Sequence, residues 1–377
     1  MMKPVFIAAC LLAALALQAQ APSLLKQNGI RIGVMPAGRL NAITDVQGVK
    51  VGQVTVLQGD SVRTGVTSIL PHGGNLFQQK VPAAVFVGNG FGKLAGTTQI
   101  AELGTIESPI VLTNTLSVAA GIQGIIEYTL QQPGNDKVQS VNAVVGETND
   151  GFLNDIRGMH VSKAQVLQSM LQADTGVVAQ GNVGAGTGTV CFGWKGGIGT
   201  ASRQLPANLG GYTVGVLVQT NFGGVLEIAG VPVGQLLQKY ALKDELNHTP
   251  DGSCMIVVAT DAPLDARNLE RLAKRAFMGL AKTGGIASNG SGDYVIAFST
   301  ANKVPHQPTA VVVPAQYLHN EATTPLFMAA IEATEEAIIN SLFAAATMKG
   351  KAGRTIEALP KEKVISLIQQ YKRGNGQ

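Results

Sequence analysis

Short apolar runs rich in β-branched residues alternate along this chain with longer stretches of helical periodicity, and this alternation limits the fold more than any other feature. Runs bounded by Gly, Pro or Asn predict strands at 43–56, 83–88, 110–113, 142–146, 212–220, 255–260, 294–299 and 310–314. Apolar residues recur every three to four positions in stretches that predict helices at 117–130, 162–172, 232–242, 265–280, 325–348 and 361–371. The first strand region alternates apolar and polar residues around Gly48 and Gly52, which is typical of a half-buried hairpin.

The predicted strands are nearly continuous in apolar residues, so both faces of their sheet should be covered. This favours a layered α/β or α+β architecture. Gly makes up 46 of the 377 residues and is spread between the short runs, which indicates many tight turns. Two helices have clear N-terminal signals, since Asp265 precedes one and Pro325 lies in the first turn of the other. No Ser/Pro-rich linker divides the chain, so residues 22–377 are predicted to form a single domain.

The first 21 residues have the order of a secretory signal peptide. Positions 1–3 give a positive start, 5–17 are apolar, and Ala19-Gln20-Ala21 offers small residues for cleavage after Ala19 or Ala21. The run is too short to cross a bilayer as a mature helix. A lipid anchor on Cys10 is disfavoured, because little apolar sequence precedes it. We therefore expect a periplasmic or secreted protein without membrane attachment in its mature form.

Composition and spacing exclude several classes of partner and cofactor. The formal net charge of +4 is spread over the whole chain without a dense basic stripe, so nucleic acid is not an expected partner. The histidines are single and scattered, which predicts no metal site and no metal cofactor; they are His72, His160, His248, His306 and His319. After removal of the leader only Cys191 and Cys254 remain, so one disulfide is the upper limit.

Familiar enzyme motifs fail on inspection. The stretch 88–93 resembles a phosphate-binding loop, but Val87 stands where the first Gly is needed and Leu94 where Ser or Thr is needed. A second glycine-rich stretch, 184–189, lacks the third Gly of a dinucleotide fingerprint and is better explained as a turn. Neither a GxSxG elbow nor an HExxH helix occurs in the sequence. No nucleotide or other cofactor is expected.

One segment joins a turn to a strand in a way that suits chemistry. In 247–262, Asp251 and Gly252 lead into Ser253, the first residue of a predicted strand. A serine in that place can attack the preceding carbonyl, which Gly252 leaves open. Cleavage there would give an N-terminal serine whose α-amine, with an ordinary pKa near 7.7 to 8.0, can act as a base. From spacing alone, however, Asp-Gly-Ser before a strand is more often a simple turn.

The chain resembles the DmpA family of L-aminopeptidase/D-amidase-esterases and β-peptidyl aminopeptidases over essentially the whole mature length. Many short stretches match in order, namely 41–46, 48–52, 63–67, 146–151, 153–156, 184–187, 195–203, 219–223, 251–253 and 259–264. The resemblance implies an α+β fold, a four-layer α-β-β-α sandwich like that of N-terminal-nucleophile hydrolases. It also implies self-cleavage between Gly252 and Ser253 into chains 22–252 and 253–377, and a homotetramer of cleaved protomers.

The same resemblance implies roles for six residues. Ser253 matches the nucleophile. Asn221 matches the Asn that stabilises the oxyanion, and Ser291 and Asp293 match the residues that orient the nucleophile and its amine. Glu147 matches the acid that holds the substrate's free ammonium group, and Asn149 stands where some relatives have an oxyanion-assisting Tyr. Without the resemblance, these residues would be interpreted as ordinary turn and loop positions.

Three functions remain open from the sequence. The first is an aminopeptidase or amidase that releases N-terminal residues, α-L, D or β, from short peptides, amides or esters. The second is an acyltransferase like the ornithine acetyltransferases, which resemble this fold but use Thr as nucleophile in the cytoplasm; Ser253 and the leader oppose it. The third is a non-catalytic periplasmic protein on the same fold, which the combined presence of five residues opposes, namely Ser253, Asn221, Ser291, Asp293 and Glu147.

Overall fold

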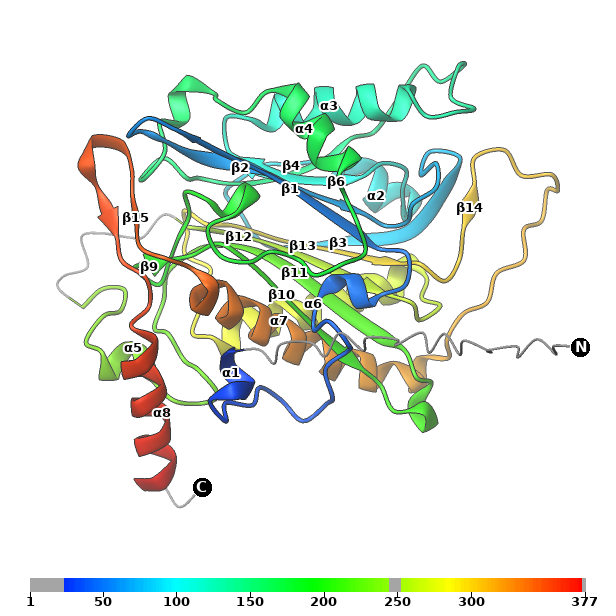
Figure 1. Cartoon of the computed structure of the whole chain (residues 1–377). Helices are drawn as coiled ribbons and strands as arrows, with labels where there is room; N and C mark the ends of the chain where they lie inside the picture. Colours follow the sequence, from blue (N-terminus) through cyan, green and yellow to red (C-terminus); the bar gives the residue numbers. More distant parts are fainter. Residues whose placement is uncertain (1–23, 244–251, 375–377) are drawn as a thin grey trace, which may run out of the picture.

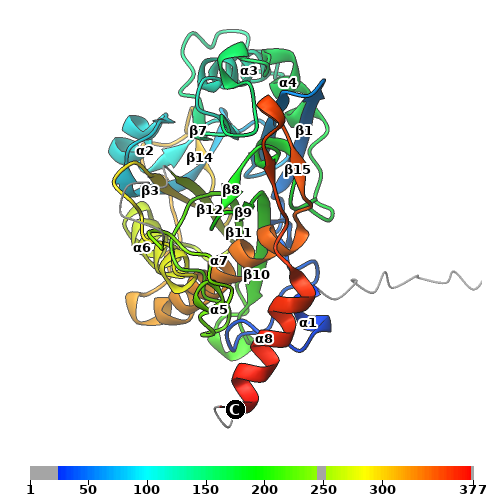
Figure 2. The same ribbon diagram turned by 90° about the vertical axis from the view of Figure 1, so that its left-hand side faces the viewer.

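The computed structural model describes residues 24–243 and 252–374, which form four stacked layers in the order α-β-β-α (Figures 1 and 2). This confirms the predicted sandwich. The predicted signal peptide (1–21), His248 and Asp251 lie outside the described residues. Within the described ranges no helix is long and apolar enough to cross a membrane.

The two central layers are mixed sheets. The first has the strand order β1-β2-β6-β7-β4, and the second has the order β10-β11-β12-β13-β3-β14 with β5 added beside β3. The strands of the first sheet are β1 (Lys50–Gln58), β2 (Val62–Leu70), β4 (Leu94–Ala95), β6 (Ile110–Asn114) and β7 (Val144–Thr148). Those of the second are β3 (Gln79–Gly90), β5 (Thr105–Ile106), β10 (Ile198–Gln204), β11 (Thr213–Asn221), β12 (Ser253–Thr260), β13 (Gly292–Ser299) and β14 (Val304–Pro305).

Two pairs of helices form the outer layers (Figure 1). The pair α3 (Val118–Leu130) and α4 (Lys163–Leu171) packs on the first sheet, and the pair α6 (Ala266–Lys282) and α7 (Thr324–Ala344) packs on the second. The remaining elements are α1 (Leu24–Gln27), α2 (Thr97–Leu103), α5 (Val233–Leu236), α8 (Lys361–Gly374), and the short strands β8 (Val190–Cys191), β9 (Trp194–Lys195), β15 (Met348–Lys349) and β16 (Thr355–Ile356).

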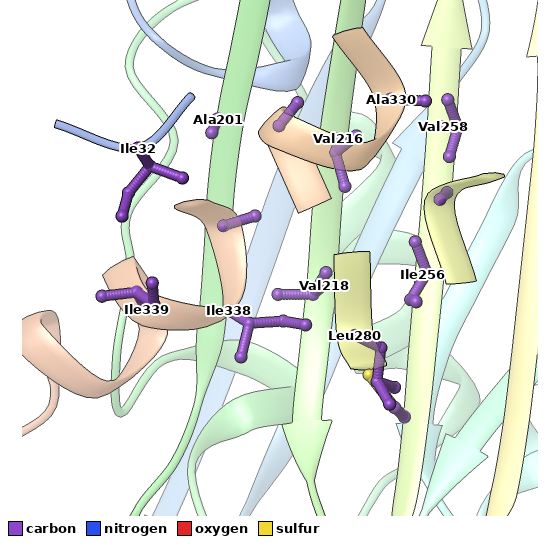
Figure 3. Packing of buried hydrophobic residues seen from close by; sticks show 14 of the residues in the cluster. Ile32, Ala201, Val216, Val218, Ile256, Val258, Leu280, Ala330, Ile338 and Ile339 are labelled. Carbon is purple, nitrogen blue, oxygen red and sulfur yellow. The ribbon is translucent and has the colours of Figure 1, made fainter. Parts of the chain in front are cut away.

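Side-chain alternation along the strands fills the spaces between layers. On β12, Ile256 and Val258 pack toward α6 and α7, as Figure 3 shows, while Met255 and Val257 belong to the core between the two sheets. Ser253 lies two residues before Met255, so it continues the face that is turned toward the other sheet. The pattern that builds the core therefore also aims the predicted nucleophile between the sheets.

The register of the second sheet brings distant parts of the sequence together. Antiparallel β11 and β12 pair Asn221 with Ser253, and parallel β12 and β13 pair Ser253 with Gly292. On the far side of β13, antiparallel β3 pairs Gly90 with Gly292. The ends of four strands, β11, β12, β13 and β3, thus lie side by side around the predicted cleavage site.

Helix signals in the sequence are confirmed at their N-termini. Ser162 caps α4 in a capping box with Gln165, and the Asp265 side chain accepts a hydrogen bond of 2.8 Å from the Asn268 amide at the start of α6. Pro325 lies in the first turn of α7 as predicted. At α4 and α6 a side chain thus satisfies an otherwise unpaired amide, whereas Pro325 of α7 has no amide hydrogen to satisfy.

Several predicted elements are wrong. Residues 43–45 form a 3₁₀ turn rather than a strand, and β1 pairs instead with β2, which was not predicted. The apolar run 310–314 is an exposed loop that pairs with no strand in the described part of the chain, because an apolar run alone does not ensure a pairing partner. The predicted helix 232–242 ends at Leu236, since left-handed backbone at Gln238 (φ 56°) interrupts it.

Candidate active site

A cavity of about 320 Å³ lies where ends of the two sheets meet. The cavity is lined by residues at the end of β3, around the ends of β6 and β7, and around the starts of β12 and β13. These residues are Gly90, Phe91, Gly92, Lys93, Thr115, Glu147, Asn149, Gly252, Ser253 and Gly290. Three of the predicted site residues, Glu147, Asn149 and Ser253, therefore share one pocket. A larger cavity of about 630 Å³, lined by 29–32, Arg203 and other residues, contains none of them.

Ser253 lies beside the carbonyl group that precedes it. Its Oγ donates a hydrogen bond of 2.7 Å to the Gly252 carbonyl oxygen, and only 6% of the residue is exposed. The Gly292 amide, from the neighbouring strand, lies 3.2 Å from the same carbonyl oxygen and 3.3 Å from Oγ. A Cβ on residue 252 would meet the Phe222 Cα at 2.8 Å, so Gly is required there by close packing. The hydroxyl and a polarised carbonyl are thus held together.

Asn221 lies next to Ser253 on β11 and is fixed through both ends of its amide. Its Oδ1 accepts from the Val190 amide at 3.0 Å, and its Nδ2 donates to the Asn149 carbonyl at 3.1 Å. These contacts set which end of the side chain is the donor. Preorganised donors of this kind stabilise developing oxyanions most effectively, because they need no reorientation during the reaction.

Ser291 and Asp293 flank Gly292 at the start of β13 but do not line the pocket. Asp293 lies two residues before Val295 on β13, so both side chains point to the helix-covered core, whereas Ser253 faces the other sheet. Among the described residues, the Ser291 hydroxyl and both Asp293 carboxylate oxygens have no hydrogen-bond partner of standard geometry, and all three atoms are buried. Burial raises the pKa of Asp293 to about 6, although the nearby Ser291 hydroxyl and Cys254 backbone oppose the shift. The pair is a buried polar site beside the nucleophile's backbone.

The raised pKa of Asp293 predicts a pH-dependent effect on stability. The folded state disfavours the ionised carboxylate relative to the unfolded state, so a penalty of up to roughly 3 kcal/mol is present above pH 6 and vanishes below about pH 4. In an uncut Ser253→Ala background, Asp293→Asn should therefore stabilise the fold at pH 8 and have little effect at pH 4. Urea unfolding at both pH values measures this; an equal difference at both would contradict it.

Glu147, at the end of β7, presents a buried carboxylate to the pocket with 3% of its side chain exposed. Its Oε1 accepts a hydrogen bond of 3.0 Å from the Lys93 amide, and its Oε2 accepts from the Thr115 hydroxyl. The Lys93 ammonium lies 3.8 Å from Oε1. A carboxylate held in this way is a ready partner for a substrate ammonium group.

Asn149 is exposed at the pocket wall. Its Oδ1 accepts from the Gly151 amide at 2.9 Å, which closes a local turn, and its backbone carbonyl holds the Asn221 amide. With Oδ1 engaged in the turn, its Nδ2 is the end of the side chain suited to donate toward a substrate.

Lys195, a buried residue that was not predicted to contribute, stabilises the backbone next to the site. The Lys195 ammonium donates to the carbonyls of Gly186 and Gly196 at 3.0 and 2.7 Å, and burial lowers its pKa to about 7. Burial likewise raises the pKa of nearby Asp150 to about 7. Lys195 thus connects the two ends of segment 186–196, and the Val190 amide in this segment positions Asn221.

In the described part of the chain, no group of three or more His, Cys, Asp or Glu side chains is arranged to hold a metal ion. The two described cysteines, Cys191 and Cys254, are buried and free. The reactive and binding groups described at the site are a hydroxyl, amides and carboxylates.

Sequence reasoning missed the Gly292 amide, Thr115 and Lys93. The glycine-rich run 88–93 was examined only as a phosphate loop, yet its end forms one wall of the pocket. Glycine is favoured at position 92, since a Cβ there would make a tight contact of 3.2 Å with the Gly292 Cα. A glycine-rich run directly after a strand was the available signal, but its partner could not be identified from sequence.

Comparisons with known proteins agree with this geometry. Residues 41–356 match the protein family described as "Peptidase family S58". The β-peptidyl aminopeptidase BapA of Sphingosinicella microcystinivorans is 41% identical, with 98% of this chain and 97% of that protein aligned. Among solved structures, the PH0078 protein of Pyrococcus horikoshii OT3 is 48% identical with a TM-score of 0.85, covering 92% of this chain and 99% of that one. The L-aminopeptidase D-Ala-esterase/amidase of Ochrobactrum anthropi, described as a prototype serine aminopeptidase and a variant of the Ntn hydrolase fold, is 36% identical with a TM-score of 0.84, covering 92% and 98%.

Proposed function

The chain belongs to peptidase family S58 and is a serine aminopeptidase on the Ntn hydrolase fold, and from that premise we propose that it cleaves itself before Ser253 and then releases N-terminal residues, β-amino acids among them, from short peptides and amides. The observation that carries the proposal is that Ser253 and Glu147, from different sheets, line the same pocket. One supplies a nucleophile and the other an anchor for a free amine.

Self-cleavage follows from the contacts around Gly252. The Ser253 Oγ attacks the Gly252 carbonyl carbon, the bond to the Ser253 nitrogen breaks, and the hydroxyl proton passes to the departing amine. The Gly292 amide, 3.2 Å from the carbonyl oxygen, donates to the negative charge that develops there. Water then hydrolyses the resulting ester, which leaves a Gly252 carboxylate and an N-terminal Ser253. The products are the chains that end at residue 252 and begin at residue 253.

The new N-terminus supplies both groups that peptide cleavage needs. The neutral α-amine of Ser253 accepts the proton of its own Oγ as that oxygen attacks the substrate carbonyl. The Asn221 Nδ2 donates to the oxyanion, and Ser291 and Asp293 orient the amine from the adjacent strand. The protonated amine then protonates the leaving group, and water hydrolyses the acyl-enzyme with the amine again acting as base. Asn149 assists as a second amide donor at the pocket wall.

Glu147 selects substrates by their free N-terminus. A buried carboxylate fixes the substrate ammonium, so it also fixes how far away the scissile carbonyl lies. A panel of α-L, D and β-amino acid p-nitroanilides, each with a free and an acetylated amine, tests this directly. We expect turnover of free-amine substrates, including the β-amino acid member that the BapA relatives suggest. Equal turnover of acetylated substrates would refute the anchor.

Glu147→Gln should lower kcat/KM about 10- to 100-fold for free-amine substrates, because hydrogen bonds to charged groups contribute about 1.5–3 kcal/mol. Steady-state kinetics on a β-amino acid p-nitroanilide measures the loss. The matched control is Glu127→Gln, which removes the same charge from α3, where Glu127 pairs with Lys163 at 2.6 Å and does not line the pocket. A similar loss in both variants would show that net charge, not amine binding, is responsible.

We also propose export, a single mature domain from residue 22, and a homotetramer of cleaved protomers. The leader-like sequence of residues 1–21 supports export. N-terminal sequencing of the larger chain from cell fractions tests it, and native mass spectrometry tests the assembly. A larger chain that retains Met1, or a cleaved monomer, would reject the respective proposal.

A further inference from the structure

We propose that Lys93 adapts the pocket to N-terminal residues that carry a carboxylate on the amine-bearing carbon, which is the arrangement in β-linked aspartyl residues. The inference rests on the proposed function, because it requires Glu147 to bind the substrate ammonium while Ser253 attacks. It adds a second recognition element and a defined substrate class.

The pocket holds one anion and one cation side by side. The Lys93 ammonium lies 3.8 Å from the Glu147 Oε1, and the Lys93 side chain is 56% exposed whereas that of Glu147 is 3% exposed. The buried carboxylate is therefore the inner group and the ammonium the outer one. Both residues line the cavity that contains Ser253.

The backbone that carries Lys93 is anchored. Its amide donates to the Glu147 Oε1 at 3.0 Å. Two residues before Lys93, the Phe91 amide donates to the Ser291 carbonyl at 3.1 Å. Four residues before Lys93, the Asn89 side chain donates to the Asn289 carbonyl at 3.2 Å. The chain is thus held on both sides of Lys93, since Leu94 after it pairs with Gly146 of β7. The freedom of Lys93 is therefore confined to its flexible side chain, which can turn to a ligand without moving the loop.

A β-linked aspartyl residue matches this pair of charges. Its ammonium and carboxylate are attached to the same carbon, and one methylene separates that carbon from the scissile carbonyl. The spacing from amine to carbonyl is therefore that of a β-amino acid. When the substrate ammonium binds Glu147, its carboxylate lies beside the position of the Lys93 ammonium. One ion pair in the empty pocket is then replaced by two.

An α-linked aspartyl residue does not fit in the same way. Its scissile carbonyl is attached directly to the amine-bearing carbon, and its carboxylate lies one methylene further away. With the amine on Glu147, the carboxylate and the carbonyl exchange places relative to a β-linked residue. Lys93 therefore distinguishes the two linkages of one amino acid.

The test compares two p-nitroanilides of matched configuration that differ in a single group. One is the β-p-nitroanilide of aspartic acid, and the other is the p-nitroanilide of β-homoalanine, in which a methyl group replaces the carboxylate. In each, water cleaves the amide bond and releases p-nitroaniline. The enzymes are the fully cleaved wild type, Lys93→Met, Lys93→Arg, and the control Lys274→Met, which removes an exposed lysine paired with Glu270 on α6.

We expect Lys93→Met to lower kcat/KM for the aspartyl substrate about 10-fold while the methyl substrate changes less than about 3-fold. Lys93→Arg should retain the aspartyl activity, and Lys274→Met should change neither. If the wild type cleaves only the methyl substrate, or Lys93→Met leaves the ratio of the two unchanged, the inference is wrong while the proposed function stands. If the wild type cleaves neither, the proposed function itself fails and the inference fails with it.

Discussion

Purified Ser253→Ala protein is expected to run as one uncut chain and to lose at least about 10⁴-fold of its aminopeptidase activity. The substitution removes the Oγ that lies 2.7 Å from the Gly252 carbonyl oxygen, so the peptide bond loses the hydroxyl that attacks it. Without cleavage there is also no free α-amine to act as base. One change therefore abolishes both the formation and the operation of the site.

Intact-mass analysis and kinetics on a β-amino acid p-nitroanilide measure the two effects separately. The control is Ser366→Ala, which removes an exposed hydroxyl from α8 and should leave both cleavage and activity unchanged. Cleavage before residue 253 in the Ser253→Ala protein, or retained activity in its uncut chain, would exclude Ser253 as the nucleophile.

Asn221→Ala is expected to lower kcat about 10²- to 10³-fold with a smaller change in KM, because loss of one oxyanion donor has an effect of that size. Truncation also frees the Val190 amide and the Asn149 carbonyl from their contacts at 3.0 and 3.1 Å. Asn221→Asp separates these effects, since it keeps an acceptor for Val190 but replaces the donor. Both variants should be slow.

The measurement requires fully cleaved protein, so the extent of self-cleavage is recorded by mass before kinetics. The Gly292 amide, not Asn221, contacts the Gly252 carbonyl oxygen, so cleavage should proceed in both variants. A kcat within about 10-fold of wild type in cleaved Asn221→Asp would exclude Asn221 as the main oxyanion donor.

Much of the fold could be predicted because its pattern is local. The helix that follows Asp265 and the strand that follows Ser253 are marked by caps, turns and unbroken apolar periodicity. Strand β2 was missed because Arg63, Thr64 and Gly65 interrupt its apolar pattern, and it is defined by pairing with β1 rather than by composition. The prediction for 310–314 failed for the opposite reason, since its composition is that of a strand but no described strand pairs with it.

The site was harder to predict from the sequence than the fold. Ser253, Asn221, Ser291, Asp293, Glu147 and Asn149 were proposed through a family resemblance, because in isolation each resembles a turn or loop residue. The structure brings Ser253, Asn221, Glu147 and Asn149 close together, while Ser291 and Asp293 lie buried on the adjacent strand outside the pocket. The backbone amide of Gly292 could not be predicted at all, since its role arises from strand register and not from side-chain identity.

The most direct test of the central claim is the intact mass of freshly purified wild-type protein under denaturing conditions, with N-terminal sequencing of the smaller chain. We predict two chains, the smaller beginning Ser253-Cys254-Met255. A single full-length mass in protein that hydrolyses free-amine substrates, or a cut at another bond, would contradict it.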